Sequence, residues 1–209
     1  MDFFSIQHIA FTVMQYPVSY LELIGTVSGL LSVYYASRTN ILTWPTGIVN
    51  EIALFALFFQ VQLYADMFLQ VYFLVVTLYG WYNWKVKAGD LPVRRLSKKG
   101  VVTYSALLIL GAAVAGSLIR QLHNWLPAYF PLPAAYPYVD AGIMIASILA
   151  TVLLARKQVE TWVLWIAIDI VSVVLYYVKG VYFLSLEYVI FLGLATAGLI
   201  NWKKSMEYA

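Results

Sequence analysis

The sequence predicts an all-α membrane protein of seven transmembrane helices, arranged as two parallel three-helix repeats joined by a linker helix (3+1+3). Of its 209 residues, 63% are hydrophobic and 11% are charged, whereas a soluble domain is about 45–50% apolar and about 25% charged. Seven apolar runs of about 20 residues follow one another, and that length crosses about 30 Å of hydrocarbon. The chain also matches itself without gaps at an offset of 118 residues, which indicates an internal repeat.

The segment before the first span, residues 1–16, is expected to form a short interfacial helix. Its apolar side chains Phe3, Phe4, Ile9 and Phe11 would face lipid. The segment has neither the basic n-region nor the small-residue cleavage site of a secretory signal peptide. It is also too short and too mixed in composition to span the bilayer.

Apolar length and short polar breaks place the spans. They are expected near residues 18–37, 41–61, 64–84, 100–121, 136–155, 159–178 and 181–202. The first repeat then occupies residues 17–84 and the second occupies residues 136–204. Residues 85–135 hold a basic loop, the linker helix and an outer loop rich in proline and aromatic residues.

Positive charges fall almost entirely on one side of this arrangement. That side carries Arg38, Lys85, Lys87, Arg94, Arg95, Lys98, Lys99, Arg156, Lys157, Lys203 and Lys204, and the other carries Arg120 and Lys179. Because cytoplasmic loops are enriched in lysine and arginine, the C-terminus is predicted to be cytoplasmic and the N-terminus outside. The basic loop could instead bind nucleic acid. Its length and position are better explained by a role in setting the membrane orientation of the chain, so no nucleic-acid partner is expected.

The internal match pairs polar residues as well as apolar ones. Glu22 falls on Asp140, Glu51 falls on Asp169, and the triplet Asn-Trp-Lys recurs. Three helices per repeat would invert the second copy, but the linker helix restores its direction. One known architecture of membrane transporters has two parallel repeats with a binding site between them, near the midplane of the membrane.

The sixth span carries polar and aromatic residues at spacings of three and four. They are Trp162, Trp165, Asp169, Ser172 and Tyr176, and this spacing places them on one helix face. Polar groups in a span are costly, so the face is predicted to line a cavity where tryptophan rings hold a flat ring and Asp169 balances a positive charge. The alternative is that the tryptophans anchor the helix at the interface and Asp169 bonds a neighbouring helix.

The second span begins near Thr43 and carries three further substrate-binding candidates, Trp44, Asn50 and Glu51. The Asn50 amide suits ribose hydroxyls or a carboxamide because it both donates and accepts hydrogen bonds. Glu51 is the repeat partner of Asp169, so the two carboxylates are expected to face each other. The alternative for both polar residues is a hydrogen bond that fixes helix packing.

The third span adds Gln70 and Phe73 to the candidates. Asp66, Gln70, Phe73 and Thr77 share one helix face. Asp66 lies close enough to the outer surface to be solvated, whereas Gln70 lies deeper and is the better ligand candidate.

Composition argues against other functional classes. The chain has no cysteine and two histidines, His8 and His123, which excludes thiolate chemistry and a histidine metal cluster. No metal and no cofactor are therefore expected. The acids within the spans are related by the repeat and have no histidine beside them, so an enzyme is not expected. A purely structural subunit would need no polar, aromatic face directed inward.

Motifs along nearly the whole chain carry a family resemblance. They are Trp44-Pro45-x-Gly47-Ile48-x-Asn50, Tyr64-Ala65-Asp66, Leu69-Gln70-Val71-Tyr72, Tyr79-Gly80-Trp81, Trp162-x-x-Trp165-x-x-x-Asp169, Leu175-Tyr176, Lys179-Gly180 and Asn201-Trp202. With them the sequence resembles the PnuC family of bacterial vitamin transporters. The resemblance implies a SWEET-like fold, a homotrimer in the bacterial inner membrane, and uptake of nicotinamide riboside by facilitated diffusion with trapping by cytoplasmic phosphorylation.

Nicotinamide riboside, a small cationic vitamin, matches the residues identified above. Trp162 and Trp165 suit its flat ring, Asp169 or Glu51 its charge, and its polar edge suits the amides of the second and third spans. Tyr176 lies on the same face as the two tryptophans. Thiamine is also a flat cation and remains the alternative substrate, riboflavin is carried by close relatives, and a proton-coupled carrier is a less favoured mechanism. Membrane lipid is the other expected partner.

Overall fold

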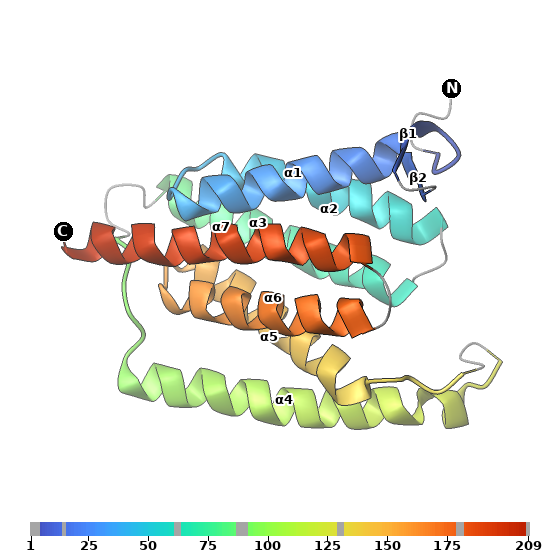
Figure 1. The fold of residues 1–209 in the computed structure, drawn as a ribbon. Helices are drawn as coiled ribbons and strands as arrows, with labels where there is room; N and C mark the ends of the chain where they lie inside the picture. The colour runs from blue at the N-terminus through green and yellow to red at the C-terminus, as the bar shows by residue number, and fades with distance from the viewer. Residues whose placement is uncertain are drawn as a thin grey trace. The chain divides into compact units, whose positions relative to one another are not determined.

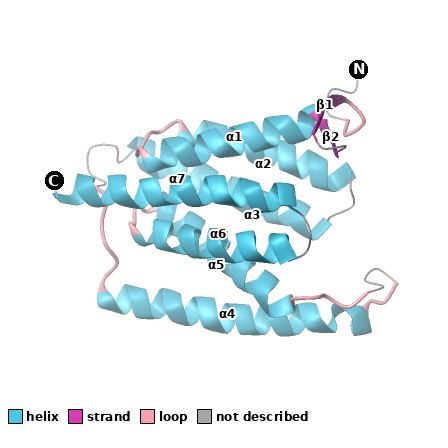
Figure 2. Ribbon diagram, in the orientation of Figure 1, coloured by secondary structure: helices cyan, strands magenta, loops and turns pink. Residues whose placement is uncertain are grey.

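A computed structural model of the chain describes residues 5–13, 16–60, 64–86, 92–128, 132–178 and 182–207. In these ranges a short hairpin precedes seven helices (Figures 1 and 2). The elements are β1 (Ile9–Val13), β2 (Tyr16–Ser19), α1 (Tyr20–Ser37), α2 (Thr43–Gln60), α3 (Tyr64–Val86), α4 (Lys98–Trp125), α5 (Pro137–Ala155), α6 (Glu160–Val178) and α7 (Tyr182–Glu207). The predicted all-α class with seven helices is confirmed. The helix bounds lie within a few residues of the predicted spans, and α4 and α7 each extend at least a turn further at their C-terminal ends, to Trp125 and Glu207.

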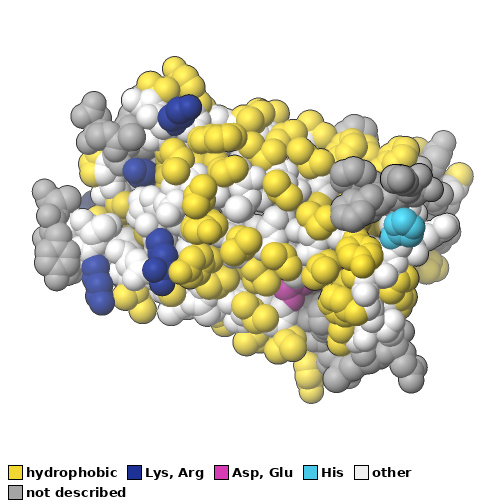
Figure 3. Space-filling model, turned by 90° about the horizontal axis from the view of Figure 1, so that it is seen from above, with side chains coloured by type: hydrophobic (Ala, Val, Ile, Leu, Met, Phe, Trp, Pro, Cys, Tyr) yellow, Lys and Arg dark blue, Asp and Glu magenta, His cyan; other side chains and the backbone are white. Residues whose placement is uncertain are grey.

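Four helices of the described ranges are long and apolar enough to cross a membrane by length and composition. They are α4, α5, α6 and the part of α7 from Ser185 to Met206. Much of their apolar surface is exposed, as on α4, where Val102 is 69% exposed and Ile109 is 67% exposed. Figure 3 shows many apolar side chains spread across the face in view, with lysine and arginine side chains at the left. Such a surface suits lipid rather than water.

The interfacial helix predicted over residues 1–16 is wrong for the residues that the structure describes there. Strand β1 pairs antiparallel with β2, with Phe11 opposite Val18 and Thr12 opposite Pro17. β-Branched and aromatic residues favour strands, and a proline disfavours helix in the residue before it. Phe3 and Phe4 lie outside the described residues.

The hairpin leads directly into α1. The Tyr20 amide donates to the His8 carbonyl at 3.0 Å, and Ser19 caps the helix by accepting from the Glu22 amide at 3.1 Å. The Tyr16 hydroxyl donates to Glu22 at 3.1 Å. These bonds fasten the strands to the first turn of the helix.

The chain divides into two compact units. The first comprises residues 1–93, 154–157 and 197–209, and in it α1 packs on α2 and α2 on α3. The second comprises residues 94–153 and 158–196. Its core is a cluster of Ala146, Ala150 and Ile168 against which Leu108 and Trp165 pack.

The turn after α1 and the turn after α5 have the same local structure. Thr39 and Lys157 both have a positive φ, 54° and 52°. After α1, the Asn40 amide donates to the Tyr35 carbonyl at 2.9 Å, and the residue before Asn40 donates to Ala36. This is a Schellman motif.

Corresponding bonds, each 118 residues further along, close the turn after α5, where the Gln158 amide donates to the Leu153 carbonyl at 2.9 Å. The match continues into the following helices. The Thr43 hydroxyl donates to the Ser32 carbonyl at 3.0 Å, and the Thr161 hydroxyl donates to the Ala150 carbonyl at 2.8 Å. The register predicted from the sequence therefore has a local structural counterpart.

Gly80 lies where α3 meets the ring of Trp44. A Cβ atom at Gly80 would lie 2.2 Å from the Trp44 ring, whose side chain is 2% exposed. We expect Gly80→Ala to lower the free energy of unfolding by about 1–3 kcal/mol, because the buried ring must move. Thermal unfolding in detergent measures this change.

Gly142→Ala and Gly193→Ala are the matched controls, because a Cβ atom at either position would meet nothing within 4 Å. Both should be neutral or stabilising by about 0.5–1 kcal/mol, since alanine favours helix more than glycine does. Equal effects at all three positions would contradict the close contact at Gly80.

Partial burial and the neighbouring Glu22 carboxylate raise the pKa of Tyr16 above its ordinary value of 10.0. The folded state therefore retains this proton at a pH where the unfolded state loses it. The stabilisation is complete below the unfolded pKa and is lost as pH rises through the folded value. NMR titration of ¹³C-labelled tyrosine, assigned with Tyr16→Phe, should show a raised pKa that Glu22→Gln partly restores. An unshifted Tyr16 would contradict the contact.

Candidate functional site

Glu51 of α2 lies buried inside the first unit. Its side chain is 7% exposed, and the hydroxyl of Thr77 on α3 donates to one carboxyl oxygen at 2.5 Å. The other oxygen is buried without a hydrogen-bond partner among the described residues. A buried carboxyl group with so few partners is costly, so this position requires an explanation beyond helix packing.

Asn50, the residue before Glu51, is tied to α1. Its side-chain amide nitrogen donates to the Gly25 carbonyl at 2.8 Å and lies 2.9 Å from where a Cβ atom at Gly29 would stand. This is the interhelical bond considered as the alternative from the sequence. A role for Asn50 in substrate binding stays a prediction.

Gln70 and Phe73 lie on α3 at spacings that place them on the side of Thr77. Gln70 is 6% exposed, and the Phe73 ring meets the Tyr72 ring edge to face at 5.7 Å. The structure therefore gathers Glu51, Gln70 and Thr77 as buried polar residues of one three-helix bundle.

Trp44 lies apart from these residues, about 10 Å from Glu51 along α2 at 1.5 Å per residue. Its ring is edge to face with Trp84 of α3, with centroids 5.1 Å apart. The structure thus places Trp44 in an aromatic cluster at the start of its helix.

In the second unit, Asp169 and Ser172 of α6 are buried, with exposed fractions of 3% and 0%. Tyr176, one turn further, stacks on Tyr188 of α7 with ring centroids 5.4 Å apart and planes 12° apart. Acidic, hydroxyl and aromatic groups therefore gather on the predicted face of α6.

Tyr188 was not among the substrate-binding residues predicted from the sequence. The signal that could have found it is the repeat, because Tyr188 falls on Gln70 at the offset of 118 residues. Trp162 is 1% exposed, and Trp165 packs against the core cluster of Ala146 and its neighbours. Packing within the protein thus accounts for part of the surface of both tryptophans.

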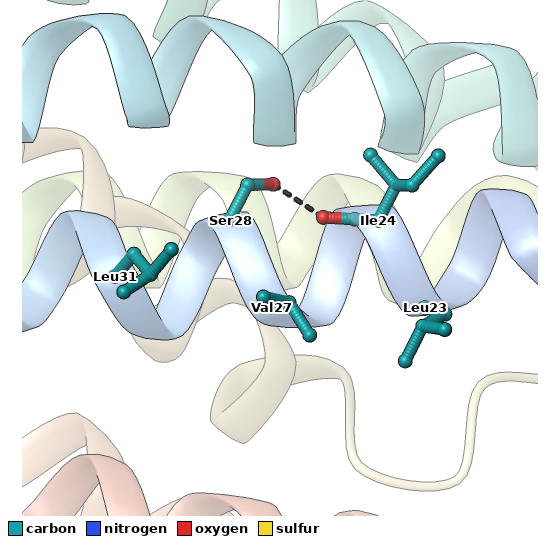
Figure 4. A pocket seen from close by; sticks show the side chains of 5 residues that line it. All are labelled: Leu23, Ile24, Val27, Ser28 and Leu31. Carbon is teal, nitrogen blue, oxygen red and sulfur yellow. Dashed lines mark hydrogen bonds between the residues drawn. The ribbon is translucent and has the colours of Figure 1, made fainter.

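A shallow depression lies on α1. Leu23, Ile24, Val27, Ser28 and Leu31 line it (Figure 4). Its one hydroxyl, on Ser28, donates to the Ile24 carbonyl at 2.5 Å, so the helix itself satisfies that group. An apolar hollow of this kind suits a lipid chain better than a polar ligand.

The helices and their buried polar residues define the class. Long apolar helices with acidic, amide and aromatic side chains buried within them are the features of a multi-pass membrane transporter. Residues 19–204 match the sequence profile of the nicotinamide mononucleotide transporter family. The chain belongs to that family.

Individual relatives agree with this assignment. The chain is 33% identical over 228 residues to the nicotinamide riboside transporter PnuC of Escherichia coli (strain K12), covering 98% of this chain and 95% of the relative. It is 27% identical over 193 residues to the riboflavin/roseoflavin transporter RibM of Streptomyces davaonensis, covering 92% and 89%. These relatives are transporters and not enzymes, and the resemblance to PnuC proteins is confirmed.

The fold has a counterpart among solved structures. The crystal structure of the vitamin B3 transporter PnuC matches with a TM-score of 0.69 and 23% identity, covering 90% of this chain and 83% of that one. Fold class and family thus agree, while the roles of individual site residues stay predictions.

The Glu51–Thr77 bond can be tested by a double-mutant cycle. Thr77→Val should lower the free energy of unfolding by about 1–3 kcal/mol, because it leaves the buried carboxyl group without its donor. Glu51→Met combined with Thr77→Val should recover much of this loss, because both polar partners are then gone. Additive losses in thermal unfolding would show that the bond contributes nothing.

Proposed function

We propose that this protein carries nicotinamide riboside across the bacterial inner membrane by facilitated diffusion. The observation that carries the proposal is the buried acid of α6, Asp169, on the helix that also presents Tyr176, whose ring stacks on Tyr188. A carboxylate in an apolar helix attracts a cation, and aromatic faces bind a flat cationic ring. The PnuC relative at 33% identity is named for the same substrate.

The predicted residues offer groups of the kind this substrate needs. The nicotinamide ring is flat and positively charged, which suits Trp162, Trp165 and Asp169. The ribose and the carboxamide need donors and acceptors, and the first unit offers those of Asn50 and Gln70. Glu51, with its bare carboxyl oxygen, is the second candidate for the positive charge. Phe73 and Trp44 complete the proposed set as aromatic contacts.

Transport proceeds by alternating access between two three-helix repeats in a 3+1+3 plan. The recurrence of the Schellman turns and of the threonine bonds at 118 residues supports two copies of one unit. The C-terminus lies in the cytoplasm, as the distribution of lysine and arginine indicates. Phosphorylation in the cytoplasm traps the vitamin, and the protein assembles as a homotrimer like the family it resembles.

A second substrate, riboflavin, is favoured by the relative RibM, which is named for riboflavin and roseoflavin. Riboflavin is flat and hydroxylated but uncharged, so it would provide no positive charge to pair with the buried acids. Thiamine is a flat cation and fits the same residues as nicotinamide riboside. Charge therefore separates riboflavin from the other two, and only direct binding separates nicotinamide riboside from thiamine.

The proposal is tested by titrating the purified protein with each of the three vitamins. We expect saturable binding of nicotinamide riboside, weakened about tenfold or more by Asp169→Asn, because the loss of one charge–charge contact of about 1.4 kcal/mol lowers affinity by that factor. Trp165→Ala should abolish binding through the loss of its aromatic face. Isothermal titration calorimetry measures both effects.

Trp125→Ala is the matched control, because this tryptophan is 60% exposed on α4 and belongs to neither group of buried polar residues. It should bind like the wild type. Thermal unfolding separates lost binding from lost folding. Tight binding of thiamine alone would overturn the substrate, and unchanged affinity in Asp169→Asn would remove that acid from the site.

A further inference from the structure

Two buried hydrogen bonds link helix ends that belong to different predicted repeats. Asn83 of α3 donates from its amide nitrogen to the carbonyl of Ala155, the last residue of α5, at 2.8 Å. Trp202 of α7 donates from its indole nitrogen to the carbonyl of Ala36, near the end of α1, at 2.9 Å. The third helix of each repeat therefore holds the first helix of the other.

All of these residues lie in the first compact unit, and they are nearly inaccessible. Asn83 is 5% exposed, Trp202 is 0% exposed, and both acceptor residues are buried. The ring of Trp84 lies 6.1 Å from that of Trp202. We call this group of Ala36, Asn83, Trp84, Ala155 and Trp202 the inner joint.

Lys157 adds a charge to the inner joint. Its ammonium group lies 4.8 Å from the centroid of the Trp84 ring, and burial lowers the pKa of this lysine. An ammonium group held over a buried ring regains water when the contact opens. The lysine thus favours an open state more than an apolar side chain would.

Two indole groups at this end lack hydrogen-bond partners among the described residues. The ring nitrogens of Trp44 and Trp84 are both buried without an acceptor, although most buried donors in proteins are paired. In a core that never opens, two unpaired donors are a constant cost. In a contact that opens in every cycle, water forms hydrogen bonds with both donors in the open state.

We propose that the inner joint is the closed gate on the cytoplasmic side of the transporter. The proposal rests on the alternating-access mechanism proposed above. Such a carrier separates its two repeats at one side in each half-cycle. The inner joint fastens the ends of four helices from both repeats, next to the basic residues Arg38 and Lys203 of the predicted cytoplasmic side. Opening toward the cytoplasm breaks both hydrogen bonds and parts the Trp84 and Trp202 rings.

The absence of native cysteine allows a clean reporter at the joint. Ser37, next to the acceptor Ala36, is 3% exposed, so Ser37→Cys should react slowly with a maleimide while the gate is closed. Added Trp202→Phe keeps the ring but removes the donor. We expect about tenfold faster labelling, because a hydrogen bond of this kind shifts an equilibrium by roughly that factor.

Asn83→Ala, which removes the other donor, should accelerate labelling in the same way and serves if Trp202→Phe does not fold. Trp125→Phe, which alters an exposed indole on α4, should leave the rate unchanged. A second arm needs no further variant: saturating nicotinamide riboside should change the labelling rate of the Ser37→Cys protein, because transport populates the open gate.

The outcomes separate the gate from the transport proposal. Unchanged labelling in both donor variants, with folding intact, would overturn the gate and show the joint to be static packing. Labelling that responds to the donor variants, in a protein that binds no nicotinamide riboside, would support the gate and overturn the proposed substrate. A response to both the donor variants and the vitamin supports the two proposals together.

Discussion

The constraint on which this structure depends is that polar groups buried in apolar helices must find partners within the protein. In lipid no water is available to satisfy them, so a buried polar group that is paired fixes the neighbour against which its helix packs. Asn50 selects the backbone of α1 at Gly25, and Thr43 selects the same helix at Ser32. Glu51 selects Thr77 on α3. The three-helix bundle of the first unit is therefore fastened by a few directional bonds, while its apolar side chains contribute packing with little preference for a neighbour.

The sequence was informative where one physical rule dominates. Apolar length located all seven helices. Pro45 fits the first turn of α2, because a proline there loses no hydrogen bond. The hairpin was missed for a corresponding reason. An apolar, aromatic segment such as Ile9–Val13 fits either an interfacial helix or a strand, and only its pairing with Tyr16–Ser19 decides between them. Pairing is a contact between segments, and periodicity within one segment does not reveal it.

The same limit applies to the candidate site. Glu51, Gln70 and Asp169, which helical spacing and the cost of burial singled out as ligand candidates, are buried polar residues. Spacing does not tell whether a helix face meets a ligand, a backbone carbonyl or another ring. The acceptor for Asn50 is a carbonyl group on α1, and every residue carries a carbonyl, so no side-chain pattern could have indicated it. Trp44 illustrates the same point, since its partners Trp84 and Gly80 come from a helix that begins twenty residues later.

The paired Schellman turns have a mechanical consequence. Thr39 and Lys157 share one backbone conformation although their side chains have nothing in common, so the hydrogen bonds of the turn, and not the residue type, impose it. A connection this short, braced one turn further by a threonine bond to the preceding helix, has almost no freedom to bend. Displacement at the end of the first helix of such a pair is therefore passed on to the second, and each helix pair moves as a stiff lever with its pivot outside the turn.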